Sequence, residues 1–275
     1  MTAELTMSSS SMEPMLLSPN PCMMLTLKRI AYLGLLGAPK TRCFGATIIY
    51  SGLKSPFTIL PFNQAPQISW MAIVPPYTPH IIKSRDRYIC NIMVEDECTT
   101  YKTLARDMNI MSDSAIRRIR HVFTRIGQGR IDSGLNTTEF DDLFFNRSLP
   151  SRPLDHRIAK TVEHLRQRPH ENIPATELAD ILTLSFSRFL HLFKDEVGVT
   201  YRQFRAWKRA RAVLTFANGP MNATLVAMET GYPDSSHFSH SIRHYFGLRP
   251  KDIFAGSQRL RILTSSAQAA QNLPR

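Results

Sequence analysis

One short pattern occurs twice in the last third of the chain, between Ile173 and Phe254. In each copy an alanine follows an apolar residue, a turn residue stands four positions later, and a capped second helix follows the turn. The alanine, the turn residue and the N-cap are Ala179, Thr183 and Ser185 in the first copy and Ala227, Gly231 and Asp234 in the second. An alanine lets two helices approach closely, and glycine turns the chain at little steric cost. The repeat therefore predicts two helix-turn-helix motifs in tandem.

The second helix of each copy has an apolar face and a polar face. The apolar residues are Phe189, Leu192 and Phe193 in the first copy and Phe238, Ile242 and Phe246 in the second. The polar face is free to enter a DNA groove. A long helix from about Thr200 to Phe216 joins the copies and would span roughly 25 Å. Because successive major grooves on one DNA face lie about 34 Å apart, this helix suits a strut between the motifs.

Residues 158–254 resemble the DNA-binding domain of the AraC/XylS family of bacterial transcription regulators. The residues that carry the resemblance are Leu178-Ala179, Ser185 to Phe189, Phe193-Lys194, Gly198, Arg209-Ala210, Ala227, Gly231-Tyr232, Asp234 to Ser239, Phe246-Gly247 and Pro250. The resemblance implies a cytoplasmic, sequence-specific DNA-binding regulator, more often an activator than a repressor, and not an enzyme. It also implies double-stranded DNA and RNA polymerase as partners, and no cofactor.

The family motif also assigns roles to individual positions of the two second helices. The residues implied to meet base edges are Ser187, Leu190, His191, Ser235, Ser236, Ser239 and His240. The residues implied to contact phosphates are Ser185, Arg188, Lys194, Arg243 and His244. His191 can donate to guanine and Leu190 can pack on a thymine methyl group, whereas the second copy offers mainly hydroxyl groups. We therefore expect the first copy to supply most of the sequence discrimination, although each position has a solvated surface residue as its alternative.

The first half of the chain alternates short apolar runs with prolines, which predicts a small antiparallel sheet or partial barrel. The expected strands are Ala46–Tyr50, Phe57–Leu60, Ile68–Val74 and Tyr88–Val94. The run from Met71 to His80 resembles the cupin-like effector domains common in the AraC/XylS family. That resemblance implies a small-molecule effector, with His80 as a candidate ligand contact or, alternatively, a structural histidine. The apolar stripe of a helix at Asp113–Ile126 either packs on this sheet or pairs two subunits in a homodimer.

These patterns predict an α+β chain that is mostly α. A small, cupin-like β domain with helices precedes an all-α domain whose two helix-turn-helix motifs are joined by a long helix. The expected segments are a disordered N-terminus at 1–25, a sensor or oligomerisation domain at 26–147, a linker at 148–153, the DNA-binding domain at 154–260 and a tail at 261–275. Because residues 151–260 contain complete apolar faces for their helices, we expect this fragment to fold alone.

The net charge of +12 fits a polyanionic partner, but the excess is spread over both halves of the chain. The apolar run Ile30–Ala38 is too short to cross a bilayer, so we expect no membrane association. His237, His240 and His244 share one helix, but no cysteine or carboxylate of that helix joins them. We therefore predict no metal site.

Two alternatives remain open. A DNA alkylation-repair protein can share this DNA-binding module, but it needs a four-cysteine zinc site and a nucleophilic cysteine. The spacing of Cys22, Cys43, Cys90 and Cys98, with no CxxC pair, does not fit that site. The second alternative is a sensor whose DNA-binding half has degenerated, which Leu190 and His240 at base-facing positions would favour.

Overall fold

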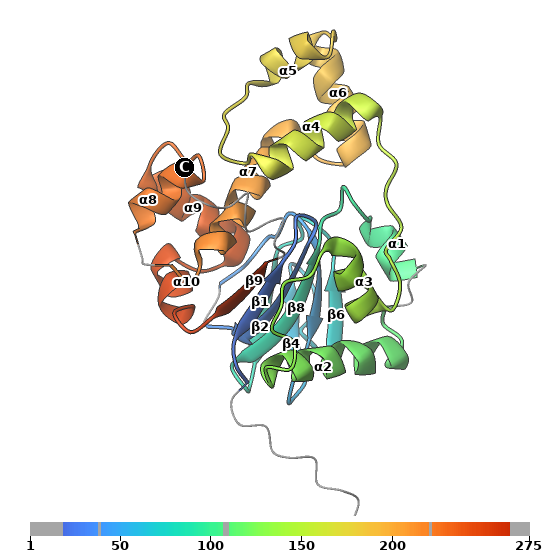
Figure 1. Ribbon diagram of the computed structural model, residues 1–275, viewed down its shortest axis with the longest axis vertical. Coiled ribbons are helices and arrows are strands. Elements are labelled where there is room, and N and C mark those ends of the chain that lie inside the picture. Colours follow the sequence, from blue (N-terminus) through green and yellow to red (C-terminus); the bar gives the residue numbers. More distant parts are fainter. Residues whose placement is uncertain (1–18, 38–39, 107–109, 220–221, 265–275) are drawn as a thin grey trace, which may run out of the picture.

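The computed structural model describes residues 19–37, 40–106, 110–219 and 222–264. An N-terminal β domain with three helices is followed by a helical domain from α4 to α10, which is the predicted α+β arrangement (Figure 1). Within the described residues, no helix combines the length and the apolar character needed to cross a membrane.

A six-stranded sheet forms the centre of the β domain. Its strand order is β6-β3-β8-β2-β1-β9, and every neighbouring pair is antiparallel except β1 with β9. The strands are β1 (Cys22–Leu25), β2 (Arg29–Leu35), β3 (Thr47–Ser51), β6 (Met71–Val74), β8 (Tyr88–Val94) and β9 (Arg261–Thr264). A smaller antiparallel sheet, in the order β5-β4-β7, consists of β4 (Phe57–Pro61), β5 (Gln67–Ser69) and β7 (His80–Ser84).

Strands β1 and β9 lie in the segments predicted to be a disordered N-terminus and a tail. Those predictions are wrong for these residues, since all four residues of β1 are at most 2% exposed and β9 pairs with β1 in parallel. Both faces of the sheet are covered, so β1 lacks the alternation of polar and apolar residues that marks a half-exposed strand. Residues 1–18 and 265–275 lie outside the described part of the chain.

Helices α2 (Asp113–Gly127) and α3 (Thr137–Phe145) cover one face of the large sheet, and α1 (Tyr101–Arg106) precedes them. The apolar stripe of α2, including Ile119 and Phe123, is buried in one cluster with sheet residues such as Ile92. The stripe therefore packs on its own sheet. The alternative considered from the sequence, that this stripe pairs two subunits, is not supported by its burial against the sheet.

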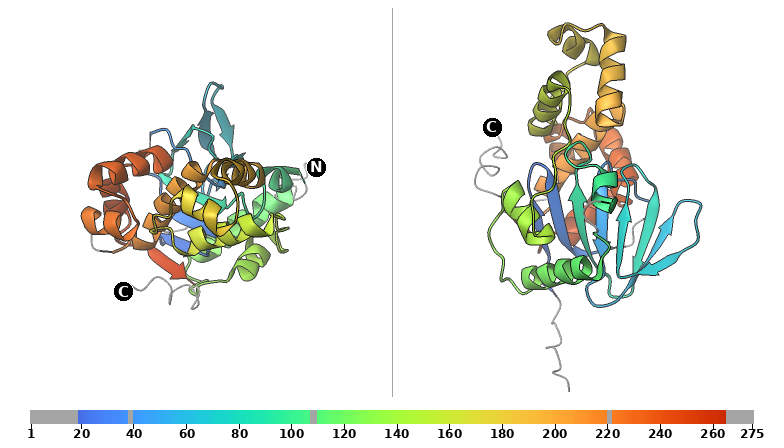
Figure 2. Two further views of the ribbon diagram at one scale, coloured as in Figure 1. Left: turned by 90° about the horizontal axis from the view of Figure 1, so that it is seen from above. Right: turned by 90° about the vertical axis from the view of Figure 1, so that its right-hand side faces the viewer.

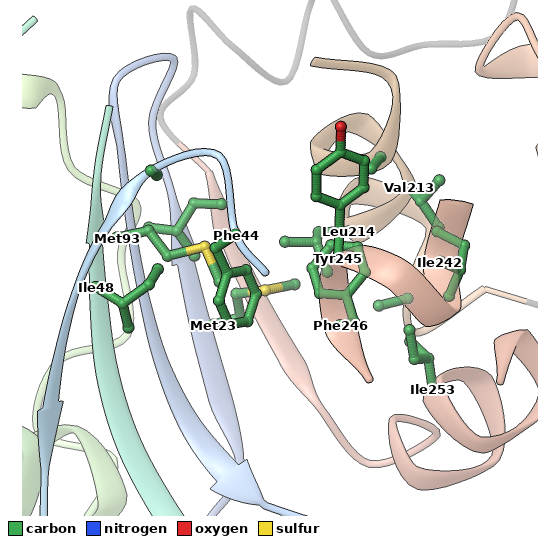
Figure 3. Close-up of a cluster of buried hydrophobic side chains, with 14 of the residues drawn as sticks. Met23, Phe44, Ile48, Met93, Val213, Leu214, Ile242, Tyr245, Phe246 and Ile253 are labelled. Carbon is green, nitrogen blue, oxygen red and sulfur yellow. The ribbon is translucent and has the colours of Figure 1, made fainter. Parts of the chain in front are cut away.

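The opposite face of the sheet packs against the second helix-turn-helix motif. That motif comprises the C-terminal half of α7 (Tyr201–Ala212), the 3-10 turn η1 (Val213–Phe216), α8 (Ala223–Glu229), α9 (Ser235–Phe246) and α10 (Pro250–Gly256). Met23, Phe44 and Met93 on the sheet side face Leu214 and Phe246 on the helical side (Figure 3). The sheet and the second motif thus share one continuous core.

The first motif forms a separate lobe above the sheet (Figure 2). It consists of α4 (His156–Gln167), α5 (Ala175–Ile181), α6 (Phe186–Val197) and the N-terminal half of α7. Phe189, Phe193 and Phe204 are among the buried residues of its core, which contains no residue of the β domain. Helix α7 therefore reaches from one core into the other.

Candidate DNA-binding interface

In the first motif the turn lies where the sequence predicted it. Ala179 is buried at the contact between α5 and α6, and its carbonyl accepts a hydrogen bond from Leu184 N at 2.9 Å. Thr183 closes the turn with φ of +56°, a left-handed conformation that is unusual for a β-branched residue. The Oγ of Ser185 caps α6 by accepting from Arg188 N at 3.3 Å.

Helix α6 presents a polar face to solvent. The predicted contact residues exposed on it are Ser187, Arg188, His191 and Lys194. Leu190 is half-buried and packs against the core of the first motif, so it offers less surface to a thymine methyl group than the sequence predicted. Of the α6 residues predicted to meet base edges, Ser187 and His191 are thus the exposed ones.

The second motif repeats the same turn. Tyr232 N donates to Ala227 O at 2.8 Å, which matches the bond that closes the first turn. Gly231 has φ of +77°, and a Cβ at this position would clash with the backbone of His170. Glycine is therefore required here by both conformation and space, whereas threonine fills the equivalent place in the first motif.

Asp234 caps α9, the second helix of the second motif. Its Oδ1 accepts from Ser236 N and His237 N, each at 2.8 Å, and its Oδ2 lies 2.8 Å from His237 Nδ1. These bonds hold the pKa of the Asp234 carboxyl group below its ordinary value. His237 is therefore a partner of the helix cap.

The exposed face of α9 carries most of the predicted contact residues. Those exposed are Ser235, Ser236, His240, Arg243 and His244, while Ser239 is half-buried. Partial burial and the neighbouring His240 lower the pKa of His244. In the free protein His244 is therefore neutral over a wider pH range than an isolated histidine is.

A hollow of about 610 Å³ runs along α7, between the start of α5 and the exposed side of α9. Three arginines of α7 line it. Arg205 donates to Ile173 O at 3.1 Å and Arg209 donates to Asn172 Oδ1 at 3.3 Å, so both hold the loop before α5. Arg202 is exposed and makes no hydrogen bond or ion pair with the described residues, which makes it available for a phosphate.

The other two cations of α7, Lys208 and Arg211, are buried in ion pairs with an acidic segment of the β domain. Four of the five basic residues of α7 thus have partners within the protein. The partners of Lys208 and Arg211 are not evident from the sequence, because the acids that bind them lie more than 100 residues away.

His80 has a structural role rather than the ligand contact considered from the sequence. It is 2% exposed, its Nδ1 donates to Thr78 O at 2.7 Å, and its Nε2 accepts from Tyr50 Oη at 2.8 Å. Burial lowers the pKa of His80 to about 4. Both ring nitrogens of this neutral histidine are thus already bonded within the protein.

The cysteines do not assemble into the site that a repair protein needs. Cys22, Cys43 and Cys90 are buried in the β domain and Cys98 is half-buried, all as free thiols. Among the residues that the structure describes, no three His, Cys, Asp or Glu side chains come together as metal ligands. The alkylation-repair alternative is therefore not supported.

A second cavity, of about 500 Å³, lies between the large sheet and the second motif. Its walls are mostly apolar and come from β1, β2 and β8 on one side and from η1 to α10 on the other. Arg42 and Asn91 line it at 5% and 4% exposure, and neither Arg42 Nε nor Asn91 Oδ1 has a hydrogen-bond partner. No acid of the described residues forms an ion pair with Arg42, so the cavity contains an unneutralised buried cation.

Comparison with protein families finds a helix-turn-helix domain at residues 178–256, which includes both turns described above. The arabinose operon regulatory protein of Escherichia coli is 25% identical over 108 residues, which cover 38% of this chain and 37% of that protein. An uncharacterised HTH-type transcriptional regulator of Haemophilus influenzae is 24% identical over 97 residues, or 35% of this chain and 33% of that protein. The chain thus spans about a third of the length of these curated relatives.

Solved structures resemble the chain over more of its length. ToxT from Vibrio cholerae O395 superposes with a TM-score of 0.55 at 10% sequence identity, covering 84% of this chain and 99% of that one. A ToxT structure bound to (E)-4-(8-methylnaphthalen-1-yl)but-3-enoic acid gives a TM-score of 0.51 at 10% identity, covering 83% and 98%. At this identity the likeness concerns the fold, which is a β domain followed by a helical domain.

Proposed function

We propose that residues 178–256, which match a helix-turn-helix domain, form a DNA-binding domain of the AraC type, and that the protein is a sequence-specific DNA-binding transcription regulator. Helices α6 and α9 read two adjacent major-groove segments, and the β domain senses a signal. The protein acts as an activator, with RNA polymerase as its protein partner. By analogy with the matched regulators, we propose that the protein binds DNA in the cytoplasm of a bacterial cell.

The observation that carries this proposal is the pair of capped helices with exposed polar faces. Each follows the same turn, and both pack on α7, which leaves His191 on α6 and His240 and Arg243 on α9 exposed to solvent. A histidine can donate to guanine, and arginine neutralises phosphate. Arg202 on α7 adds a cation between the two recognition helices.

The direct test is selection of a bound sequence from a randomised DNA library by the full-length protein. We expect a two-part site whose halves lie about one helical turn apart. Arg243→Ala should lower the slope of log affinity against log salt by about one unit without changing the preferred sequence. Arg117→Ala on the exposed side of α2 is the matched control. Selection of no sequence would contradict the proposal.

We further propose that the cavity between the sheet and the second motif binds a small-molecule effector with an acidic group. The buried guanidinium of Arg42 lies beside Tyr50 and the ring of Phe44 but has no carboxylate partner among the described residues, so it favours an anionic ligand. The apolar walls suit a hydrocarbon body, and Asn91 Oδ1 can accept one further hydrogen bond. The carboxylic acid bound to ToxT has this combination of groups.

The effector proposal is tested by thermal unfolding with aliphatic and aryl carboxylic acids, each beside the alcohol of the same skeleton. Acids that bind should raise the midpoint of the wild-type protein and leave that of Arg42→Met unchanged. Arg85→Met, at an exposed position outside the cavity, serves as the control. Equal effects of acids and alcohols would exclude recognition of the charge by Arg42.

A further inference from the structure

A buried cluster of charges joins the β domain to α7. Glu95 follows β8, and its Oε2 accepts from Trp207 Nε1 at 2.9 Å and from Lys208 Nζ at 2.6 Å. The same ammonium group donates to Glu97 Oε1 at 2.6 Å. Glu95, Glu97 and Lys208 are at most 5% exposed. Two carboxylates of the β domain thus bind side chains on one turn of α7.

Two further cations complete the cluster, and each comes from a different element. Arg211, also on α7, has its Nε 2.6 Å from Glu95 Oε1 and donates through Nη2 to Thr26 O beside β1. Arg166 comes from α4 in the first motif, and its Nη2 lies 3.4 Å from Glu97 Oε1. The cluster therefore connects the β domain, α7 and the first motif.

The position of α7 decides how the two recognition helices lie relative to each other. Tyr201 and Phe204, near its start, are buried in the core of the first motif. Trp207 and Ala210, one turn further on, are buried in the core shared by the sheet and the second motif. A shift of α7 against the sheet would move α6 relative to α9, which packs on that sheet.

Charge pairs are suited to fixing such a position, because their energy depends on geometry more sharply than that of apolar contacts. Apolar contacts are less directional than charge pairs, so the shared core fixes the position of α7 less sharply than the charge cluster does. A shift of α7 that separates these carboxylates from their cations would leave buried charges unpaired, which penalises every setting of α7 other than the observed one.

We propose that Glu95 and Glu97 are positioning residues for DNA recognition, because they fix α7 and make the protein selective for the spacing between two half-sites. This inference rests on the proposed function, since it requires that both recognition helices bind DNA. It assigns the β domain a direct part in specificity: the domain fixes the distance and angle between α6 and α9 without contacting a base.

The test compares affinity across DNA sites that carry the two selected halves with a spacer of altered length. Two added base pairs rotate one half by about 70° relative to the other. The wild-type protein should lose affinity by at least about tenfold on such a site, since it forfeits the base contacts of one half. Glu95→Gln and Glu97→Gln should reduce this loss to about threefold or less while keeping the base preference within each half.

Three further variants distinguish a change in spacing selectivity from a general loss of stability. The double variant Glu97→Gln with Lys208→Met removes both members of one pair, so it should remain folded and still relax the spacing preference. Lys208→Arg keeps the charge and should retain wild-type spacing selectivity. A purely structural role predicts instead that the charge-removing variants lose stability without any change in spacing preference. Asp132→Asn, an exposed acid of the same domain, should behave as wild type.

The outcomes separate the inference from the proposed function. If folded cluster variants keep the wild-type spacing preference, the inference is overturned while DNA binding stands. A wild-type protein that binds its sequence equally well at every spacing also overturns it. A wild-type protein that selects no sequence refutes the proposed function itself.

Discussion

The two helix-turn-helix motifs have the same turn and the same capped second helix, but they are stabilised differently. The first motif is closed around its own aromatic cluster, in which Phe193 contacts Phe189, Tyr201 and Phe204. The second shares its core with the sheet, where Phe44 of the β domain contacts both Trp207 and Phe246 edge-to-face. Local sequence therefore specifies the motif, whereas its stability depends on what covers its apolar surface.

Removing the sheet should have the largest effect, because only the second motif depends on it. Residues 151–260 expressed alone should retain protected amides in α4 to α6, whereas α8 to α10 should exchange rapidly. The reason is that the second motif loses the partner of its core, which changes the sequence-based expectation of an independently folded domain. Hydrogen exchange measured peptide by peptide decides the matter, and uniform protection across the fragment would contradict the shared core.

Two aromatic truncations should separate the cores within the full-length protein. Trp207→Ala should cost about 3–5 kcal/mol and should destabilise the sheet and the second motif together. Phe193→Ala should cost a similar free energy but lower the stability of the first motif alone. Chemical denaturation followed by hydrogen exchange resolves which amides respond. Identical exchange patterns for the two variants would show a single cooperative core.

Acidification should act on the second motif through the sheet. Since the folded pKa of His80 is about 4 and the unfolded value is about 6.5, the unfolded state binds a proton first as the pH falls. Stability should be unaffected by His80 above pH 6.5 and should decrease by about 3 kcal/mol between pH 6.5 and pH 4. Denaturation across this range should show a shallower decrease for His80→Gln, while the exposed His121→Gln should follow wild type.

The motifs should also differ in their contribution to sequence discrimination. Ser187→Ala with His191→Ala should flatten the preference at one half-site by at least about tenfold, since a base contact contributes about 1–3 kcal/mol. Ser236→Ala with His240→Ala should weaken binding more evenly across sequences. Both double variants are profiled against a randomised DNA library. Loss of preference in the second double variant would reverse the assignment.

The smallest effect concerns His244 in the second motif. Its pKa is lowered in the free protein, and a neighbouring phosphate would raise it, so DNA binding takes up a proton. Affinity should rise modestly as the pH falls from 8 to 6 and should rise less in His244→Gln. Titration of binding at several pH values provides the measurement, and a pH-independent affinity would remove His244 from the phosphate contacts.

The sequence predicted the elements whose signals are local. Ala179, Ala227 and Gly231 located both turns, and the pattern of α2 predicted a helix over nearly its observed length. The exposed face of α6 followed from the same periodicity. Leu190 differed because a residue at the edge of an apolar face can turn partly inward, which periodicity does not resolve.

The elements that the sequence missed depend on distant partners. Strand β1 is uniformly buried because a helical layer covers each face of the sheet, and β9 is recognised as a strand through its pairing with β1. In the sequence alone, Glu95 and Glu97 look like part of an ordinary acidic turn. One signal pointed to them: α7 carries five basic residues with no acid nearby, so its buried cations required acids from elsewhere.

The parallel pairing of β1 with β9 has a consequence for synthesis on the ribosome. Strand β1 (Cys22–Leu25) is made before the other strands of the sheet, but its partner β9 is complete only at Thr264. At about 5–20 residues per second the intervening chain takes tens of seconds to make. During that time the β1 edge has no partner and can pair with another nascent chain. The sheet edge at β1 is thus most vulnerable to misassembly before β9 has been made.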